Sequence, residues 1–127
     1  MENIEENKKK ILTKIQQAHI SSNFSSLPYP KLVAVSKKQE EYKIELAIES
    51  GQRIYGENRV QEAQERWQKR IELYNDIELR LIGPLQTNKV KQALNLFNII
   101  ETIDREKLAR EISNNLNNQS KTKNFYI

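Results

Sequence analysis

The sequence has 127 residues, of which 37% are hydrophobic and 30% charged, so it can form one domain around one core. It has no cysteine and a single histidine, which excludes a disulfide framework, a thiolate metal site and a cluster of imidazole ligands in one chain. The net charge of +4 arises from basic residues interleaved with 17 acidic ones, so it indicates mostly a solvated surface, with a nucleic-acid interface as the minor alternative.

The N-terminal segment MENIEENKKK is charged and lacks the apolar core of a signal peptide. No apolar run approaches the roughly 20 residues that a membrane helix needs. We therefore expect a cytoplasmic protein with no membrane partner.

Residues 2–24 are predicted to form a helix, because apolar residues recur there at helical spacing while Glu and Lys occupy the other face. The segment SSNFSSLPYP then ends the helix, since Ser, Asn and Pro favour turns. Residues 1–26 are thus predicted to be an N-terminal helix and turn. Its predicted apolar face consists of Ile4, Ile11, Leu12, Ile15 and Ala18.

From residue 31 onward, short apolar segments alternate with amphipathic helical segments, which implies parallel strands and an α/β fold. Gly51 is expected to end the first of these helices, Trp67 to lie in the core, and Thr87 and Asp104 to cap two later helices. Residues 1–127 are predicted to be one domain, with four βα units and a fifth strand in 31–127. The predicted strands are LVAV (32–35), RIYG (53–56), ELRLIG (78–83), NIIET (98–102) and the start of KNFYI (123–127).

Two architectures fit this series of βα units: an open doubly wound sheet and the first half of a (β/α)8 barrel. In both, ligands bind at the carboxyl ends of the strands. Polar residues follow each of the first four predicted strands. They are Ser36, Lys37 and Lys38; Glu57, Asn58 and Arg59; Gln86, Thr87, Asn88 and Lys89; and Glu101, Thr102, Asp104 and Arg105.

Lys37 is the most chemically suggestive of these residues. A lysine on a fixed strand end can form a Schiff base with a carbonyl compound or with pyridoxal phosphate. The alternative is an ordinary solvated lysine. Likewise, Asn58, Thr87 and Asp104 could serve only as helix caps. The residue pattern by itself leaves both interpretations open.

Four phrases narrow the choice: LVAVSKK, IYGENRVQEAQERW, LIGPLQTNKVK and IETIDREKLAREI occur in this order, each at a strand-to-helix junction. Together they cover most of residues 31–112 and closely resemble the pyridoxal phosphate homeostasis protein family, the YggS/PROSC type. That family is similar in fold to the N-terminal domain of alanine racemase. The resemblance therefore implies the barrel rather than the doubly wound sheet.

The resemblance also implies a site and a role. Pyridoxal 5'-phosphate would bind at the barrel mouth, with Lys37 as the Schiff-base lysine and Asn58, Ile82 and Gly83 lining the cofactor site. Family members look like carriers or regulators of free pyridoxal phosphate, acting on vitamin B6 and amino-acid balance, rather than enzymes with turnover.

A complete barrel has eight strands in roughly 250 residues, whereas this sequence predicts five strands. The family's phosphate-binding segment lies in its C-terminal part, so we expect a chain truncated at strand five to bind the cofactor less well. We also expect it to self-associate or to pair with the missing C-terminal half. The alternative is a truncated remnant or interaction module that binds no cofactor.

Overall fold

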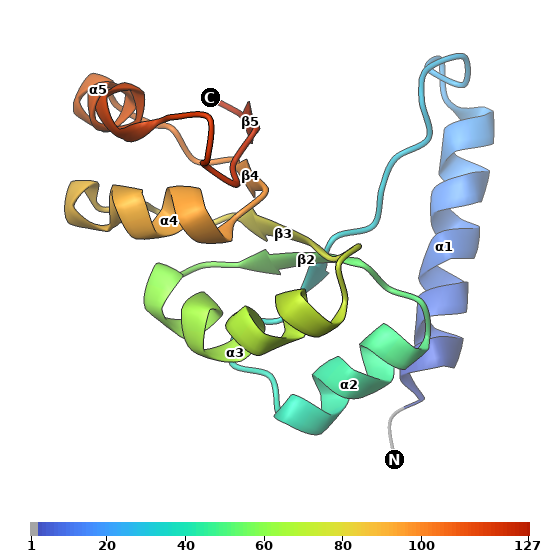
Figure 1. The fold of residues 1–127 in the computed structure, drawn as a ribbon. Helices are drawn as coiled ribbons and strands as arrows, with labels where there is room; N and C mark the ends of the chain where they lie inside the picture. The colour runs from blue at the N-terminus through green and yellow to red at the C-terminus, as the bar shows by residue number, and fades with distance from the viewer. Residues whose placement is uncertain (1–2) are drawn as a thin grey trace. The chain divides into compact units, whose positions relative to one another are not determined.

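The computed structural model describes residues 3–127, which divide into two compact units (Figure 1). The first unit contains the described part of Met1–Val33 together with Gln39–Gln52. The second contains Ala34–Lys38 and Arg53–Ile127, and it includes every strand. The prediction of one domain over residues 1–127 stays a prediction.

The first unit consists of helices α1 (Ile4–Ser21) and α2 (Glu41–Glu49) with their connecting segments. Asn3 caps α1, since its side-chain oxygen accepts the backbone N–H of Glu6 at 3.0 Å. No residue of α1 is fully buried, and Ile11 and Leu12 of its predicted apolar face are 45% and 40% exposed.

Gly51 ends α2 as predicted. Its φ of +92° belongs to the left-handed region that favours glycine after a helix. The N–H groups of Gly51 and Gln52 donate to the carbonyls of Ile48 and Ala47 at 3.0 and 3.1 Å, which satisfies the last turn of the helix.

The second unit is built on a parallel sheet in which the strands occur in their order along the chain, β1-β2-β3-β4-β5. A doubly wound sheet reverses its strand order at a switch point, so this sequential order excludes it and matches the first part of a (β/α)8 barrel. The predicted α/β fold with parallel βα units is confirmed. The strands are β1 (Ala34–Val35), β2 (Ile54–Glu57), β3 (Glu78–Leu81), β4 (Ile99–Ile100) and β5 (Asn124–Phe125).

Three helices and one short 3-10 turn belong to the same unit: α3 (Val60–Leu73), η1 (Thr87–Lys89), α4 (Val90–Leu96) and α5 (Glu106–Asn115). In Figure 1, α4 lies between α3 and α5, and it contacts both. Trp67 of α3 is fully buried as predicted, and its ring packs against Tyr55 of β2 with centroids 4.4 Å apart. The rest of this core includes Leu79, Leu81, Ile100, Phe97 and Leu108, all at 0% exposure.

Two predicted helix caps are wrong. Thr87 already lies inside η1, where the Lys89 N–H donates to the Gln86 carbonyl at 3.0 Å, so Thr87 is not at the N-cap position. Asp104 precedes the N-cap of α5, which is Arg105, and it accepts a hydrogen bond from that guanidinium at 2.7 Å. The N-cap of α4 is Lys89, two residues after Thr87, and the N-cap of α5 is one residue after Asp104, so the backbone enters both helices later than the capping side chain predicts.

None of the helices described within residues 3–127 combines the length and the apolar character needed to cross a bilayer.

Candidate functional site

The sheet register of the second unit brings three of the predicted site residues to the carboxyl ends of neighbouring strands. Val35, Gly56 and Arg80 are register partners across β1, β2 and β3. Lys37, Asn58 and Ile82 each follow two positions later, just beyond the end of their strand. Within the strands side chains alternate, so the buried Tyr55, Leu79 and Leu81 share one face of the sheet and Arg80 lies on the other.

Lys37 directly follows the last hydrogen-bonded position of the first strand. The Ser36 N–H donates to the Gly56 carbonyl at 3.1 Å, and the buried Ser36 hydroxyl lies 3.4 Å from the same oxygen. Lys37 itself is exposed, and with residues 3–127 its amine forms no hydrogen bond or ion pair. The sheet thus fixes the base of this side chain while its amine is available for chemistry.

Asn58 and Gly83 are in close backbone contact. A Cβ at Gly83 would lie only 2.4 Å from the Asn58 carbonyl oxygen and 2.7 Å from its Cα, so only glycine fits here. The Gly83 carbonyl accepts the Thr102 hydroxyl at 2.7 Å, which joins the ends of β3 and β4. The Ile82 N–H donates to the Glu57 carbonyl at 2.9 Å and continues the β2–β3 ladder.

Asn58 does not cap the helix that follows it, which was the alternative role considered for this residue. The N-cap of α3 is Arg59, whose own side chain makes no capping hydrogen bond. The Asn58 amide makes no hydrogen bond with the other described residues, so it is available to a ligand.

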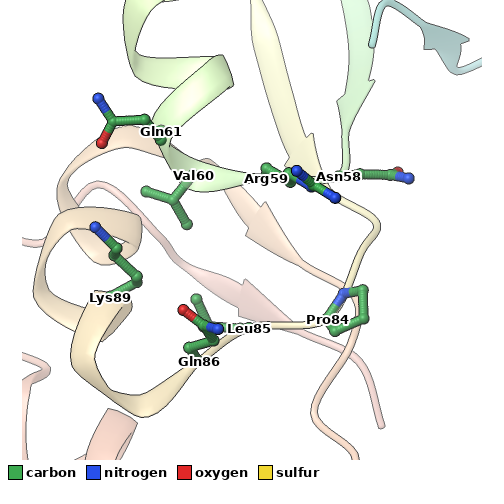
Figure 2. A pocket seen from close by; sticks show the side chains of 8 residues that line it. All are labelled: Asn58, Arg59, Val60, Gln61, Pro84, Leu85, Gln86 and Lys89. Carbon is green, nitrogen blue, oxygen red and sulfur yellow. The ribbon is translucent and has the colours of Figure 1, made fainter. Parts of the chain in front are cut away.

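A cavity of about 610 Å³ opens beside Asn58, between the loops that follow β2 and β3 (Figure 2). Its walls come from the start of α3 and from the segment leading into η1. Of the four predicted site residues, only Asn58 lines it. The lining residues are Asn58, Arg59, Val60, Gln61, Pro84, Leu85, Gln86 and Lys89.

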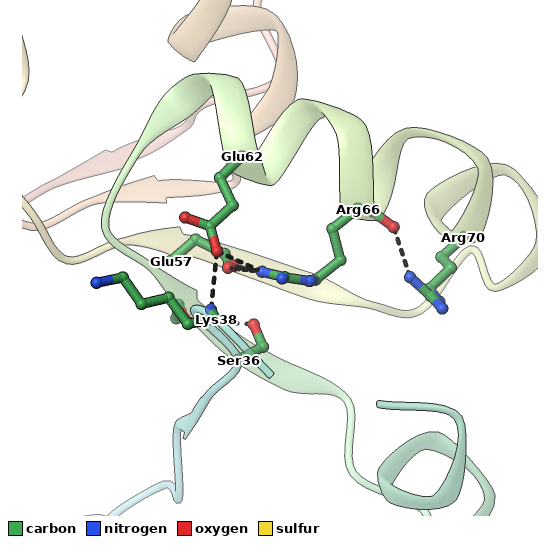
Figure 3. Close-up of polar contacts among 7 residues, drawn as sticks. Ser36, Lys38, Glu57, Glu62, Arg66 and Arg70 are labelled. Atoms are coloured by element: carbon green, nitrogen blue, oxygen red, sulfur yellow. Dashed lines mark hydrogen bonds and ion pairs between the residues drawn. The ribbon is translucent and has the colours of Figure 1, made fainter. Parts of the chain in front are cut away.

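A charged network that the sequence analysis did not identify lies at the ends of β1 and β2 (Figure 3). Arg66 of α3 donates to both carboxylate oxygens of Glu57 at 2.7 and 3.0 Å, and to Glu62 at 3.1 Å. Glu62 in turn accepts the backbone N–H of Lys38 at 2.8 Å. The spacing of Glu62 and Arg66, four residues apart on a predicted helix, was the available sequence signal.

Burial and charge act differently on the two glutamates of this network. Glu57 is 1% exposed, and this burial raises its pKa although Arg66 opposes the shift. At Glu62, the hydrogen bond from the Lys38 N–H, followed by Arg66, lowers the pKa. Glu62 is therefore the member of the network that is firmly held as an anion.

A second ion-pair cluster centres on Arg80 of β3, the register partner of Gly56. The Arg80 guanidinium is 2.9 Å from Glu78 and 3.5 Å from Glu101, and its side chain is only 11% exposed. Glu101, a strand-end residue that the sequence analysis singled out, is thus paired with Arg80.

The residues present fit the aldehyde end of pyridoxal phosphate. The Lys37 amine has no partner among residues 3–127, and Lys37 follows its strand at the same edge of the sheet as Asn58, whose amide is unengaged there, and the half-buried Ile82. The close approach at Gly83 is filled by the Asn58 backbone, so it does not form a cradle for the phosphate.

Comparison with known proteins gives consistent matches, although no family model matches the chain. The chain is 44% identical over 109 residues to a pyridoxal phosphate homeostasis protein of Buchnera aphidicola subsp. Schizaphis graminum, covering 86% of the chain and 47% of the relative. It is 37% identical over 111 residues to the protein of the same name from Haemophilus influenzae, covering 87% and 46%. The chain thus spans about half the length of the curated relatives it matches.

Solved structures give the same result. PipY of Synechococcus elongatus, with pyridoxal phosphate bound, has a TM-score of 0.63 and 37% identity, over 76% of this chain and 45% of that one. The crystal structure of an unknown protein from Bifidobacterium adolescentis has a TM-score of 0.73 and 28% identity, over 87% of this chain and 48% of that one. Sequence and fold together confirm the resemblance to the pyridoxal phosphate homeostasis protein family, which this chain matches over about the N-terminal half of its longer members.

Proposed function

We propose that this chain binds pyridoxal phosphate and that Lys37 forms a Schiff base with its aldehyde. The observation that carries the proposal is the place of Lys37 directly after β1, where its exposed amine has no hydrogen bond or ion pair among residues 3–127, at the same edge of the sheet as Asn58 and Ile82. The relative PipY has been solved with pyridoxal phosphate bound. When bound, the cofactor supplies an electrophilic aldehyde and an electron-withdrawing ring.

Each of the other predicted residues has a distinct part in this proposal. The Asn58 amide offers a hydrogen bond to the cofactor, and Ile82 offers an apolar contact. Gly83 permits the close approach that sets the position of the Asn58 backbone. The relatives are named as homeostasis proteins, and we propose the same carrier or regulatory role in vitamin B6 balance for this chain.

The test is reductive trapping. The chain is mixed with pyridoxal phosphate, reduced with borohydride, digested and analysed by mass spectrometry to locate the modified lysine. Wild-type chain and Lys38→Arg should carry the label on Lys37, and Lys37→Arg should carry none at that position. Arginine keeps the positive charge but forms no stable Schiff base here, so the adjacent Lys38→Arg is the matched control. Equal labelling of many lysines, or a label that persists in Lys37→Arg at wild-type level, would contradict the role of Lys37.

We further propose that the 127-residue polypeptide alone holds the cofactor weakly, since the resemblance places the phosphate-binding segment in the C-terminal part of longer relatives. The test titrates the chain with pyridoxal phosphate, once alone and once mixed with a separately produced C-terminal half of the Buchnera relative. Tighter binding in the mixture is the expected result. Unchanged affinity would contradict the proposal. If neither sample forms a specific adduct, the alternative of an interaction module without cofactor is correct.

The sheet edges support the proposed pairing. Among the described strands, β1 and β5 each have a single neighbour, and Val35 and Tyr126 beside those edges are each 48% exposed. Open strand edges readily accept further strands. We therefore propose that the chain self-associates or pairs with a C-terminal half. Sedimentation velocity over a hundredfold range of concentration tests this, and a monomer at every concentration, with and without the added half, would refute it.

A further inference from the structure

The residue that follows the proposed cofactor lysine has an unusual backbone conformation. Lys38 has a φ of +57°, and within residues 3–127 it is the single non-glycine residue with positive φ. L-residues rarely adopt this left-handed conformation because Cβ approaches the carbonyl oxygen, and they keep it where the surroundings hold it. A contact outside the residue is therefore needed to hold Lys38.

That contact is made by Glu62. The Lys38 N–H donates to Glu62 Oε1 at 2.8 Å, and the two residues are 24 positions apart in the sequence. The same oxygen accepts a hydrogen bond from the Arg66 guanidinium at 3.1 Å, and Arg66 also donates to the carboxylate of the buried Glu57 at the end of β2 (Figure 3). A continuous set of charge-assisted bonds thus ties the backbone after β1, through α3, to the end of β2.

Two backbone hydrogen bonds bracket Lys37. On one side, the Ser36 N–H donates to the Gly56 carbonyl at 3.1 Å, and on the other, the Lys38 N–H donates to Glu62. The Lys37 Cα is therefore fixed from both directions. This sets the direction in which an otherwise exposed side chain leaves the sheet.

Glu62 could serve only the stability of α3, as an acid in its first turn and a partner for Arg66. However, its 2.8 Å bond from the Lys38 N–H is shorter than its 3.1 Å bond from Arg66, and it goes to the backbone of another segment, at the left-handed position next to Lys37. We propose that Glu62 is a positioning residue for Lys37, which acts by holding the left-handed turn at Lys38. This inference rests on the proposed function and adds a specific residue to its site.

The first experiment compares Glu62→Ala with Glu65→Ala, an exposed acid on the same helix. Glu62→Ala should weaken pyridoxal phosphate binding about tenfold and shift part of the borohydride label from Lys37 to Lys38, which corresponds to losing one hydrogen bond to a charged group. Glu62→Gln keeps an acceptor oxygen, so it should lose less affinity for pyridoxal phosphate than Glu62→Ala. Glu65→Ala should match the wild type. An equal loss of pyridoxal phosphate affinity in Glu62→Ala and Glu65→Ala would overturn the proposal.

A rescue experiment separates positioning from helix stability. Glycine adopts positive φ without strain, so Lys38→Gly in the Glu62→Ala background should restore most of the affinity. Lys38→Ala in the same background also removes the lysine side chain but keeps the strain, and it should restore nothing. If the two double variants bind equally, Glu62 acts through α3 and the proposal is wrong.

Amide hydrogen exchange tests the hydrogen bond between the Lys38 N–H and Glu62 in the absence of cofactor. In the wild-type chain the Lys38 amide should exchange slowly, and in Glu62→Ala it should exchange about tenfold faster, while amides in the centre of α3 stay unchanged. Unchanged exchange at Lys38 would overturn the proposal. If the wild type carries no label on Lys37, the proposed function fails, and the exchange rate at Lys38 still confirms or refutes the Glu62 contact.

Discussion

The close approach of Gly83 to Asn58 makes Gly83→Ala a sharp test of the site geometry. The added Cβ would lie 2.4 Å from the Asn58 carbonyl oxygen, 2.7 Å from its Cα and 2.9 Å from its carbonyl carbon. Ordinary contacts begin near 3.4 Å, so Asn58 and Gly83 must separate by about 1 Å. All three neighbouring atoms belong to the backbone, so no flexible side chain can yield.

The surrounding hydrogen bonds resist this separation. The Ile82 N–H is bound to the Glu57 carbonyl at 2.9 Å, and the Gly83 carbonyl accepts Thr102 at 2.7 Å. Overpacking of this kind costs about 1–3 kcal/mol of stability. We therefore expect Gly83→Ala to lower the urea midpoint and, because Asn58 moves, to weaken pyridoxal phosphate binding by more than the loss of folded protein explains.

Gly51→Ala is the matched control. Its backbone has a φ of +92°, so alanine there is strained, but the added Cβ has no atom nearer than Lys8 Nζ at 4.0 Å. The expected cost is about 1–2 kcal/mol of stability, with no effect on binding by the folded protein. A Gly83→Ala chain that unfolds at the wild-type urea concentration would refute the geometric reasoning. Equal binding by the two folded variants would refute the role of Asn58.

Three further predictions concern buried or paired polar groups. Arg66→Met leaves Glu57 buried without its cation and should cost about 3–5 kcal/mol of stability in urea unfolding at neutral pH. The loss should be smaller in acid, where Glu57 takes up a proton. An equal loss of stability at both pH values would contradict this. Thr122→Val removes the hydroxyl that donates to the Phe97 carbonyl at 2.6 Å and should cost about 1–3 kcal/mol by the same measurement, whereas a neutral effect would show that this carbonyl finds another donor. Because the folded state lowers the pKa of Glu62, the ionised side chain stabilises the fold fully above its ordinary pKa of 4.5, and this stabilisation is lost as the pH falls through the folded-state pKa. The difference in unfolding free energy between wild type and Glu62→Gln should therefore narrow on acidification. A constant difference would be inconsistent with an ionised Glu62.

The element pattern was predictable because it depends on local periodicity. Apolar runs of strand length alternate with amphipathic stretches, and glycine at position 51 is suited to a helix stop, so the βα series and this stop could be predicted from composition and spacing alone. The helix starts at Thr87 and Asp104 were misplaced by one or two residues, because capping depends on where the backbone enters the helix and not only on the side chain.

Strand order was not determined by local pattern. Both a doubly wound sheet and a barrel have the same alternation, and only the pairing of all five strands shows that each strand pairs with its successor. The same pairing brings Lys37, Asn58 and Ile82 to one edge of the sheet, because residues far apart in the sequence meet only through pairing.

By itself, the sequence determined the α/β class, the family resemblance and the candidate lysine. Only the tertiary structure revealed that Gly83 is pressed against the Asn58 backbone and that Glu62 of α3 holds the turn at Lys38. Those contacts join segments about 24 residues apart, and they depend on distances of a few tenths of an ångström. Periodicity and composition carry no information at that scale, whereas packing does.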